Sequence, residues 1–417
     1  MKKYCLLLLL FLALPVCASA QWYLFPGKKK QNQQQQTTVQ DTARRIRPDS
    51  TLLRPTADTL LTEPADSLAG GQDQEVPDIF VLDIPAVIQV GLILPLQAAD
   101  KKPSENFLDF YSGALMALRD LGTGDTRIDL QVFDSAKEKT AVPQSLIDNS
   151  DIILGPVTQE SILATLPLCG KDKVLVSPLD PKAAELAATG PVVQSPAPWT
   201  AQVDELVRWV EMDRLLGAEL YMVRDTAALV PGEQTARLVG QLQERGIPYH
   251  SVRSVQEIPF QKDRQVHVLI ASDRDNFITG VVRNLSIEGA RNNDVVLYGT
   301  SRIRTNGTGP ADLHNTNAHL TASYYIDYDD PAVKRFIYAY RALFQDEPGS
   351  FAFQGYDTMH YFVTMCKTYG RQWFKKLPEY EEKGLQADFR FREDSGRVNQ
   401  AVRRIIYNPD LTMTREK

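Results

Sequence analysis

Apolar and polar positions alternate regularly from about residue 85 to the end of the chain. Short runs rich in Val, Ile and Leu are separated by longer amphipathic stretches. Such runs predict strands that are covered on both faces, as in a parallel sheet. They begin at Val87, Ile128, Asp151, Lys173 and Pro191, and a second series begins at Ala218, Ile247, Gln265, Asp294 and His319.

The stretches between these runs predict helices. Phe107, Phe110, Ala114 and Leu118 follow the spacing of one apolar helical stripe, and Gly122 can end that helix. Other helix starts are marked by capping residues and by proline at the first helical position. Further helices are expected after Thr158, after Asp180-Pro181, from Trp199 to Gly217, over residues 232–245, after Asp275, after Asp330-Pro331, and over residues 351–369.

Two successive series of alternating strands and helices predict an α/β protein with two doubly wound, Rossmann-like lobes. We assign residues 85–200 to the first lobe and residues 201–326 to the second. Residues 327–417 are divided between the lobes, and the order of elements does not show which lobe the final helices join. The segments ADFRF (387–391) and AVRRIIYN (401–408) predict a terminal hairpin.

The N-terminus has the features of a secretory signal peptide over residues 1–20. Lys2 and Lys3 precede an apolar run at residues 6–14, and Ala18-Ser19-Ala20 forms a cleavage site. Lipidation at Cys17, which would give an outer-membrane lipoprotein, is an alternative. The Gln-rich and Pro-containing segment over residues 21–84 keeps no helical or strand period and predicts a disordered tether.

Composition and motifs exclude several classes of function. The net charge of −6, without clustered Lys and Arg, disfavours a nucleic-acid partner. The catalytic signatures of hydrolases, metalloproteases and P-loop enzymes are absent from the sequence, so we expect a protein that is not an enzyme and needs no cofactor. Asp327, Asp329 and Asp330 lack the spacing of a calcium loop. Cys169 and Cys366 form either a disulfide or two separate buried thiols.

Candidate binding residues lie where the predicted strands end. In open α/β sheets, ligands bind beyond the carboxyl ends of the strands. Those ends fall in residues 95–98, 155–158, 177–180, 224–226, 272–275 and 300–302, and several precede a helix start that favours an anion. The simpler alternative is that these residues only form caps and turns. The candidate ligand-binding residues are Leu96, Thr158, Ser161, Ser177, Asp180, Arg224, Asp273, Ser301 and Tyr325.

The chain resembles the type I periplasmic solute-binding proteins of the leucine-binding class. The similarity runs from about residue 85 to residue 409. It is carried by VGLILPL, FLDFYSGALMAL, DIILGPVT, VLVSPLDP and FAFQGYDTMHYF, in that order. It implies two lobes joined by three crossovers that close on a ligand. It also implies that Thr158 or Ser161, together with residues 177–180, holds the carboxylate and amine of an amino acid, and that Tyr324 and Tyr325 wall the cleft. Asp180 departs from the small residues usual at its position.

Two functions fit this resemblance. The first is a periplasmic receptor that delivers a small polar, amino-acid-like ligand to a membrane transporter or a sensor. The second is an envelope regulator that uses the same fold to bind a peptidoglycan-synthesis protein, which the long tether favours.

Overall fold

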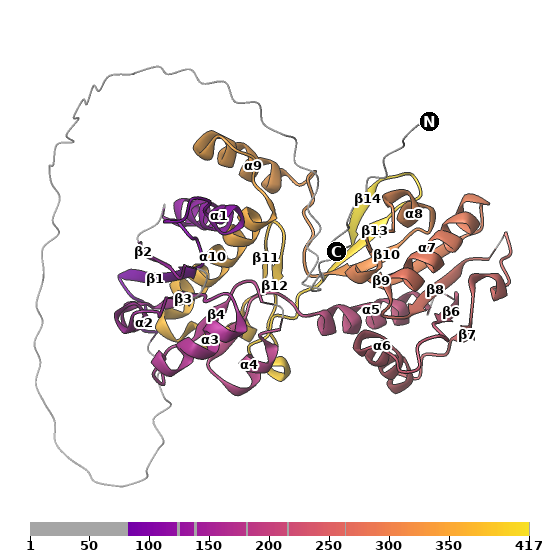
Figure 1. The fold of residues 1–417 in the computed structure, drawn as a ribbon, viewed down its shortest axis with the longest axis horizontal. Helices are drawn as coiled ribbons and strands as arrows, with labels where there is room; N and C mark the ends of the chain where they lie inside the picture. The colour runs from indigo at the N-terminus through magenta and orange to yellow at the C-terminus, as the bar shows by residue number, and fades with distance from the viewer. Residues whose placement is uncertain are drawn as a thin grey trace, which may run out of the picture. The chain divides into compact units, whose positions relative to one another are not determined.

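The computed structural model describes residues 82–122, 126–136, 140–180, 182–214, 217–262 and 264–416. The predicted signal peptide, the lipidation alternative at Cys17 and nearly all of the predicted tether lie outside these residues. Within them the chain forms two separate sheets, and a two-stranded ribbon of β11 (Glu382–Lys383) and β12 (Asp388–Phe389). The predicted pair of α/β lobes is confirmed (Figure 1).

The first lobe is built on a five-stranded parallel sheet with the order β2-β1-β3-β4-β5. Its strands are β1 (Val87–Leu94), β2 (Arg127–Asp134), β3 (Ile152–Leu154), β4 (Leu175–Ser177) and β5 (Val192–Gln194). Every residue of β3, β4 and β5 is buried, as expected for strands that helices cover on both faces.

Helices cover both faces of this sheet. One face packs against α1 (Glu105–Leu121) and α10 (Ser350–Tyr369), and the other against α2 (Gln144–Asn149), α3 (Gln159–Thr165) and α4 (Ala184–Thr189). The helix α9 (Pro331–Phe344) packs beside α1 and α10. Both final helices therefore join the first lobe (Figure 1).

The second lobe is built on a seven-stranded sheet with the order β14-β13-β10-β9-β8-β6-β7. Helices α5 and α6 cover one face, and α7 covers the other. The elements are β6 (Glu219–Arg224), β7 (His250–Val252), β8 (Val266–Ala271), β9 (Val295–Thr300), β10 (His319–Ala322), β13 (Arg403–Tyr407), β14 (Met413–Glu416), α5 (Trp199–Arg214), α6 (Glu233–Glu244), α7 (Asp275–Ala290) and α8 (Pro310–Asn315).

The predicted terminal hairpin is wrong in its pairing. β13 pairs antiparallel with β14 and with β10, whereas Asp388–Phe389 pairs with Glu382–Lys383. The sequence MTRE of β14 does not alternate between apolar and polar residues, so the pattern does not predict a strand that pairs with β13. Two helix starts also differ. α4 begins at Ala184 rather than directly after Asp180, and Arg274 rather than Asp275 occupies the cap of α7.

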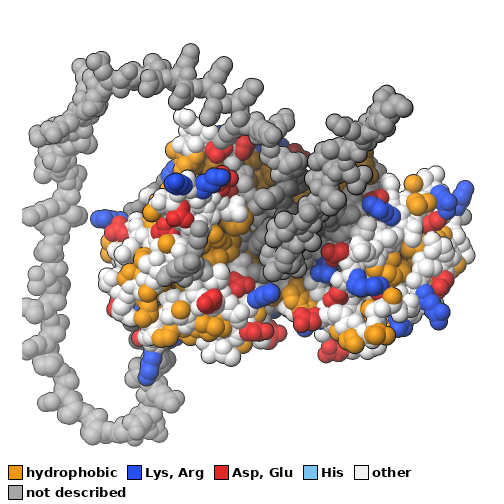
Figure 2. Space-filling view, in the orientation of Figure 1, with side chains coloured by type: hydrophobic (Ala, Val, Ile, Leu, Met, Phe, Trp, Pro, Cys, Tyr) orange, Lys and Arg blue, Asp and Glu red, His pale blue; other side chains and the backbone are white. Residues whose placement is uncertain are grey.

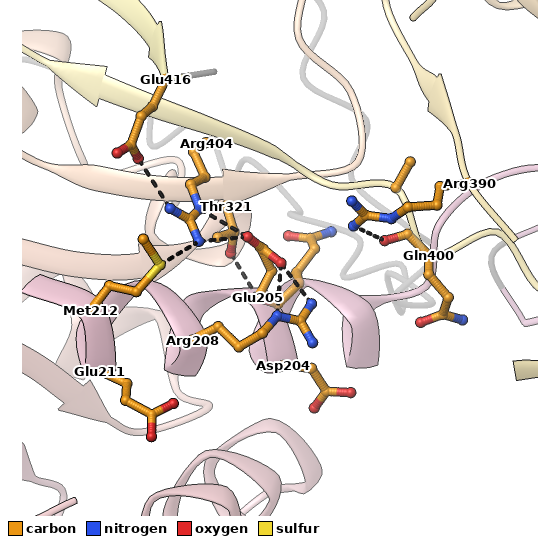
Figure 3. A network of polar contacts seen from close by, with 12 residues as sticks. Asp204, Glu205, Arg208, Glu211, Met212, Thr321, Arg390, Gln400, Arg404 and Glu416 are labelled. Atoms are coloured by element: carbon orange, nitrogen blue, oxygen red, sulfur yellow. Dashed lines mark hydrogen bonds and ion pairs between the residues drawn. The ribbon is translucent and has the colours of Figure 1, made fainter. Parts of the chain in front are cut away.

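A network of charges fixes the C-terminal strands against α5 (Figure 3). Glu205 on α5 forms ion pairs with Arg208 at 2.6 Å and with Arg404 of β13 at 2.8 Å. Arg404 also reaches Glu416 of β14 at 3.4 Å. Burial alone would raise the pKa of Glu205, but the two arginines hold it below its ordinary value.

His267 lies in β8 and is a buried histidine of the second lobe. Its side chain is 3% exposed and its Nε2 lies 2.9 Å from the side-chain oxygen of Gln265. Burial lowers the pKa of His267 to about 4, although the charge of Asp213 opposes this shift.

Acid is therefore expected to destabilise the fold through His267. Between about pH 6.5 and pH 4, His267 is protonated in the unfolded chain but stays neutral in the folded chain. The free energy of unfolding therefore falls as pH falls. The loss should approach about 3 kcal/mol at pH 4, at roughly 1.4 kcal/mol per pH unit. Urea unfolding from pH 7 to pH 4 should show a flatter decline for His267→Gln than for the wild type. Parallel declines would contradict the assignment.

Candidate functional site

The carboxyl ends of three neighbouring strands meet at one edge of the second lobe. β6, β8 and β9 are adjacent and parallel, so the loops after Arg224, Ala271 and Thr300 lie together. Open pockets of about 560 Å³ and 540 Å³ lie at this edge and share Asp273 in their linings. These volumes fall in the range of small-molecule sites, which is about 300–1,000 Å³.

Asp225, directly after β6, anchors this edge. Its carboxylate accepts hydrogen bonds from Arg274 Nε and Nη2, both at 2.6 Å, and from the Ser272 hydroxyl at 2.8 Å. These hydrogen bonds, led by that of Arg274, hold the pKa of Asp225 below its ordinary value. Asp225 is therefore an ionised group that is already neutralised by its neighbours.

Asp273, a predicted binding residue, caps a helix. Its carboxylate accepts hydrogen bonds from the backbone N–H groups of Gln234 and Thr235 at the start of α6, at 3.1 and 3.0 Å, and from the Thr235 hydroxyl. It stabilises the N-terminus of α6 from a different strand–helix loop. Arg224, also a predicted binding residue, lines the same pocket of about 560 Å³ and is exposed.

Ser301, another predicted residue, is held by Gln202 of α5. The Gln202 side-chain oxygen accepts from the Ser301 backbone N–H at 3.2 Å and from its hydroxyl at 2.9 Å. The Gln202 amide nitrogen donates to the Ser323 hydroxyl at 3.0 Å, just beyond β10. Gln202 therefore ties the start of α5 to the loops after β9 and β10.

In the first lobe, the predicted residues Thr158 and Ser161 contact each other. Thr158 caps α3, accepting from the Ser161 backbone N–H at 3.3 Å, and the two hydroxyls lie 3.0 Å apart. Leu96 lies in the core, where its side chain is 6% exposed, and its backbone N–H and carbonyl are hydrogen-bonded to Leu94 and Ser104. Asp180 accepts from the Lys182 backbone N–H at 2.8 Å in a turn.

Ser177 stands apart from the other predicted residues. It is the last residue of β4 and is fully buried, yet its hydroxyl oxygen has no hydrogen-bond partner among the described residues. Buried polar groups are almost always paired, so an orphan at the carboxyl end of a parallel strand requires an explanation.

The loop after Ser177 is joined to a crossover segment. The Gln354 amide of α10 donates to the Pro178 carbonyl at 3.0 Å and to the Tyr324 hydroxyl at 2.8 Å. The neighbouring Tyr325, a predicted residue, is half-buried, and Arg403 donates to its carbonyl oxygen. The structure thus brings the 177–180 loop and the segment after β10 together through a glutamine that the sequence pattern did not single out.

The segments that connect the two lobes are hydrogen-bonded to one another. The described chain passes between the sheets after β5, after β10 and before β13. Asn399 donates through its side-chain amide to the carbonyls of Ser195 and Asp388, at 2.9 and 2.8 Å. Arg403, with a side chain that is 1% exposed, donates to the carbonyl oxygens of Gly384 at 2.6 Å and Leu385 at 3.1 Å. It also forms a 2.7 Å ion pair with Asp388.

Solved structures share this architecture. A protein from Rhodospirillum rubrum, described as a candidate branched-chain amino acid ABC transporter, is 16% identical and aligns with 79% of this chain and 100% of its own, at a TM-score of 0.56. The chain has the type I periplasmic binding protein fold. An ABC transporter substrate-binding protein from Desulfitobacterium hafniense in complex with Leu is 15% identical over 79% of this chain and 100% of its own. Its TM-score is 0.45. A scan against protein-family models and a search of curated proteins find no match.

The described residues also show the state of the cysteines, the grouping of metal-ligating side chains, the apolarity of the helices and the surface charge. Cys169 and Cys366 are both free thiols rather than a disulfide. Over the described ranges, no group of three or more His, Cys, Asp or Glu side chains is arranged to hold a metal ion. No helix in the part of the chain that the structure covers has the length and apolarity needed to cross a bilayer. Acidic and basic side chains are interspersed on the face shown in Figure 2.

Proposed function

We propose that this protein is an exported, non-enzymatic solute-binding protein that closes its two lobes on a small polar, amino-acid-like ligand. It would deliver that ligand to a membrane transporter or a sensor in the cell envelope. The type I periplasmic binding protein fold supports this role, because the Rhodospirillum rubrum protein that shares this fold is described as a candidate branched-chain amino acid ABC transporter. Fold alone does not define a function, so the proposal depends on the site.

One observation carries the proposal: the buried, unpaired hydroxyl of Ser177 at the carboxyl end of β4. A polar group of a ligand seated at this edge would satisfy that hydroxyl. Thr158 and Ser161 on the adjacent loop and Tyr324 on the crossover segment supply further hydroxyl groups. Asp180, in the same loop as Ser177, would accept a hydrogen bond from the ligand's ammonium group.

A ligand of this class should raise the thermal stability of the protein. At a hundredfold its dissociation constant, a ligand that binds only the folded chain adds about 2.7 kcal/mol, because unfolding must also release it. We expect one or more members of a panel of amino acids to raise the melting temperature by several degrees in a thermal-shift assay. Asp180→Ala should weaken binding of the stabilising amino acid in calorimetry. Asp172→Ala, an exposed acid in the same lobe, serves as the control.

The outcome that would overturn the proposal is specific. A complete absence of stabilisation by amino acids and by cell-wall fragments, together with co-purification of a peptidoglycan-synthesis protein, would favour the envelope-regulator alternative. Equal effects of Asp180→Ala and Asp172→Ala would show that Asp180 forms only a turn.

A further inference from the structure

Two arginines lie side by side at the outer edge of the second lobe. Val223 of β6 pairs in parallel register with Val252 of β7, so Arg224, the last residue of β6, and Arg253, directly after β7, follow this pair. Both are exposed, and among the described residues neither guanidinium has a hydrogen-bond or ion-pair partner. Together with the hydroxyl residues Thr226 and Ser251 they line an open pocket of about 420 Å³.

The nearby acids do not neutralise both arginines. Asp225 is engaged by Arg274 and Ser272, and Asp273 caps α6. Glu257 is the acid in the pocket lining, and its Oε2 accepts from the Arg253 backbone N–H at 3.0 Å. The pocket therefore keeps a net positive charge and presents ten guanidinium N–H donors, about five for each arginine.

An apolar slot adjoins this charged pocket. Arg224 also lines the pocket of about 560 Å³ that lies between α6 and the loop after β6. Its apolar part is formed by Ala228, Leu229, Pro231, Ala236, Val239, Gly240 and Tyr249, and the polar residues Asp225, Thr235, Gln243, Ser272 and Asp273 complete the lining. Leu229 is fully exposed and the neighbouring Val230 is 79% exposed, so the loop offers aliphatic surface that nothing in the described chain covers.

We infer that this edge is a second binding site, which takes an amphiphilic carboxylate with its acid group on Arg224 and Arg253 and its apolar body in the slot. Arginine recognises a carboxylate through paired N–H donors, and the adjoining apolar walls gain stability by losing contact with water. Arg224 is also one of the ligand-binding residues predicted from the sequence, but the proposed solute-binding function depends on residues of the first lobe and of the crossover segments. The second site lies in the second lobe alone and uses neither Ser177 nor the crossover segments.

Isothermal titration calorimetry with 4-phenylbutanoate and its uncharged counterpart 4-phenylbutanol tests the site. We expect the acid to bind more tightly than the alcohol, and its affinity to fall as ionic strength rises. Arg224→Gln and Arg253→Gln should each weaken the acid about threefold, and the double variant about tenfold, without affecting the alcohol. Ala236→Trp should fill the slot and remove binding of both compounds.

The control is Arg335→Gln, which changes an exposed arginine of α9 in the other lobe. It should bind 4-phenylbutanoate like the wild type. The inference is overturned if the acid and the alcohol bind equally, if neither binds, or if Arg335→Gln weakens the acid as much as the double variant does. Circular dichroism of each variant confirms that the fold is intact. The arginine variants alter only exposed side chains, so they remain informative if Ala236→Trp does not fold.

Discussion

Replacing Arg403 with methionine is expected to lower the free energy of unfolding by about 3–5 kcal/mol, the usual effect of breaking a buried charged network. Its side chain is 1% exposed and donates hydrogen bonds to carbonyl oxygens of residues 325, 384 and 385. Methionine fills a similar volume but donates nothing, so these carbonyls lose their partner where water cannot replace it. Urea denaturation at pH 7 measures the change.

Two comparisons separate this effect from a general loss of charge. Arg335→Met, at an exposed position on α9, should change stability by no more than about 0.5 kcal/mol. Arg415→Met should have an intermediate effect, because Arg415 pairs with the same Asp388 but is 23% exposed. A loss below about 1 kcal/mol for Arg403→Met would show that the crossover segments are held by other contacts.

The second large effect is expected at the contact between α1 and α10. A methyl group on Gly113 would lie 1.8 Å from the Ala352 carbonyl oxygen, and one on Gly355 would lie 2.0 Å from that of Phe110. Both carbonyl oxygens belong to helix backbones, so the clash cannot be relieved by a change of side-chain rotamer. Gly113→Ala should therefore destabilise the protein by about 1–3 kcal/mol or more, although alanine favours helices over glycine by about 1 kcal/mol.

Gly280→Ala provides the matched control for this prediction. Gly280 is also within a helix, α7, but nothing lies within 4 Å of the position that its added methyl group would take. Only the helix preference remains there, so the substitution should be neutral or stabilise the protein by up to about 1 kcal/mol. Thermal unfolding of both variants measures the difference. A Gly113→Ala variant that is as stable as Gly280→Ala would mean that α1 and α10 can move apart at little cost.

The architecture could be predicted from the sequence because its strands are buried on both faces and are therefore almost continuously apolar. The partners of the C-terminal segments could not. The strand Met413–Glu416 is polar and exposed at the sheet edge, so nothing in its residues predicts that it pairs with β13. The start of α4 was also missed, since the Asp180 carboxylate forms a turn with Lys182 instead of capping the helix.

Only part of the candidate site could be predicted from the sequence. Strand ends could be located, but whether a polar side chain there is free or already bonded depends on loops distant in the chain. Asp273 and Ser301 are engaged by Thr235 and Gln202, whereas Ser177 is not engaged by any described residue. Arg403 did leave a signal. It shares the strand parity of Ile405 and Tyr407, both buried, and a charged residue on the buried face of a strand implies a buried partner.

Each lobe is built from segments that are distant in the sequence, and this limits how the two lobes can be produced separately. Strands 87–194 form the first sheet, yet that lobe is completed by helices from residues 331–369, and the second lobe is completed by strands from residues 403–416. A polypeptide that stops before α9 would lack core elements of both halves at once. Neither half can be produced by simple truncation; isolating one would require rejoining its distant pieces with an artificial linker.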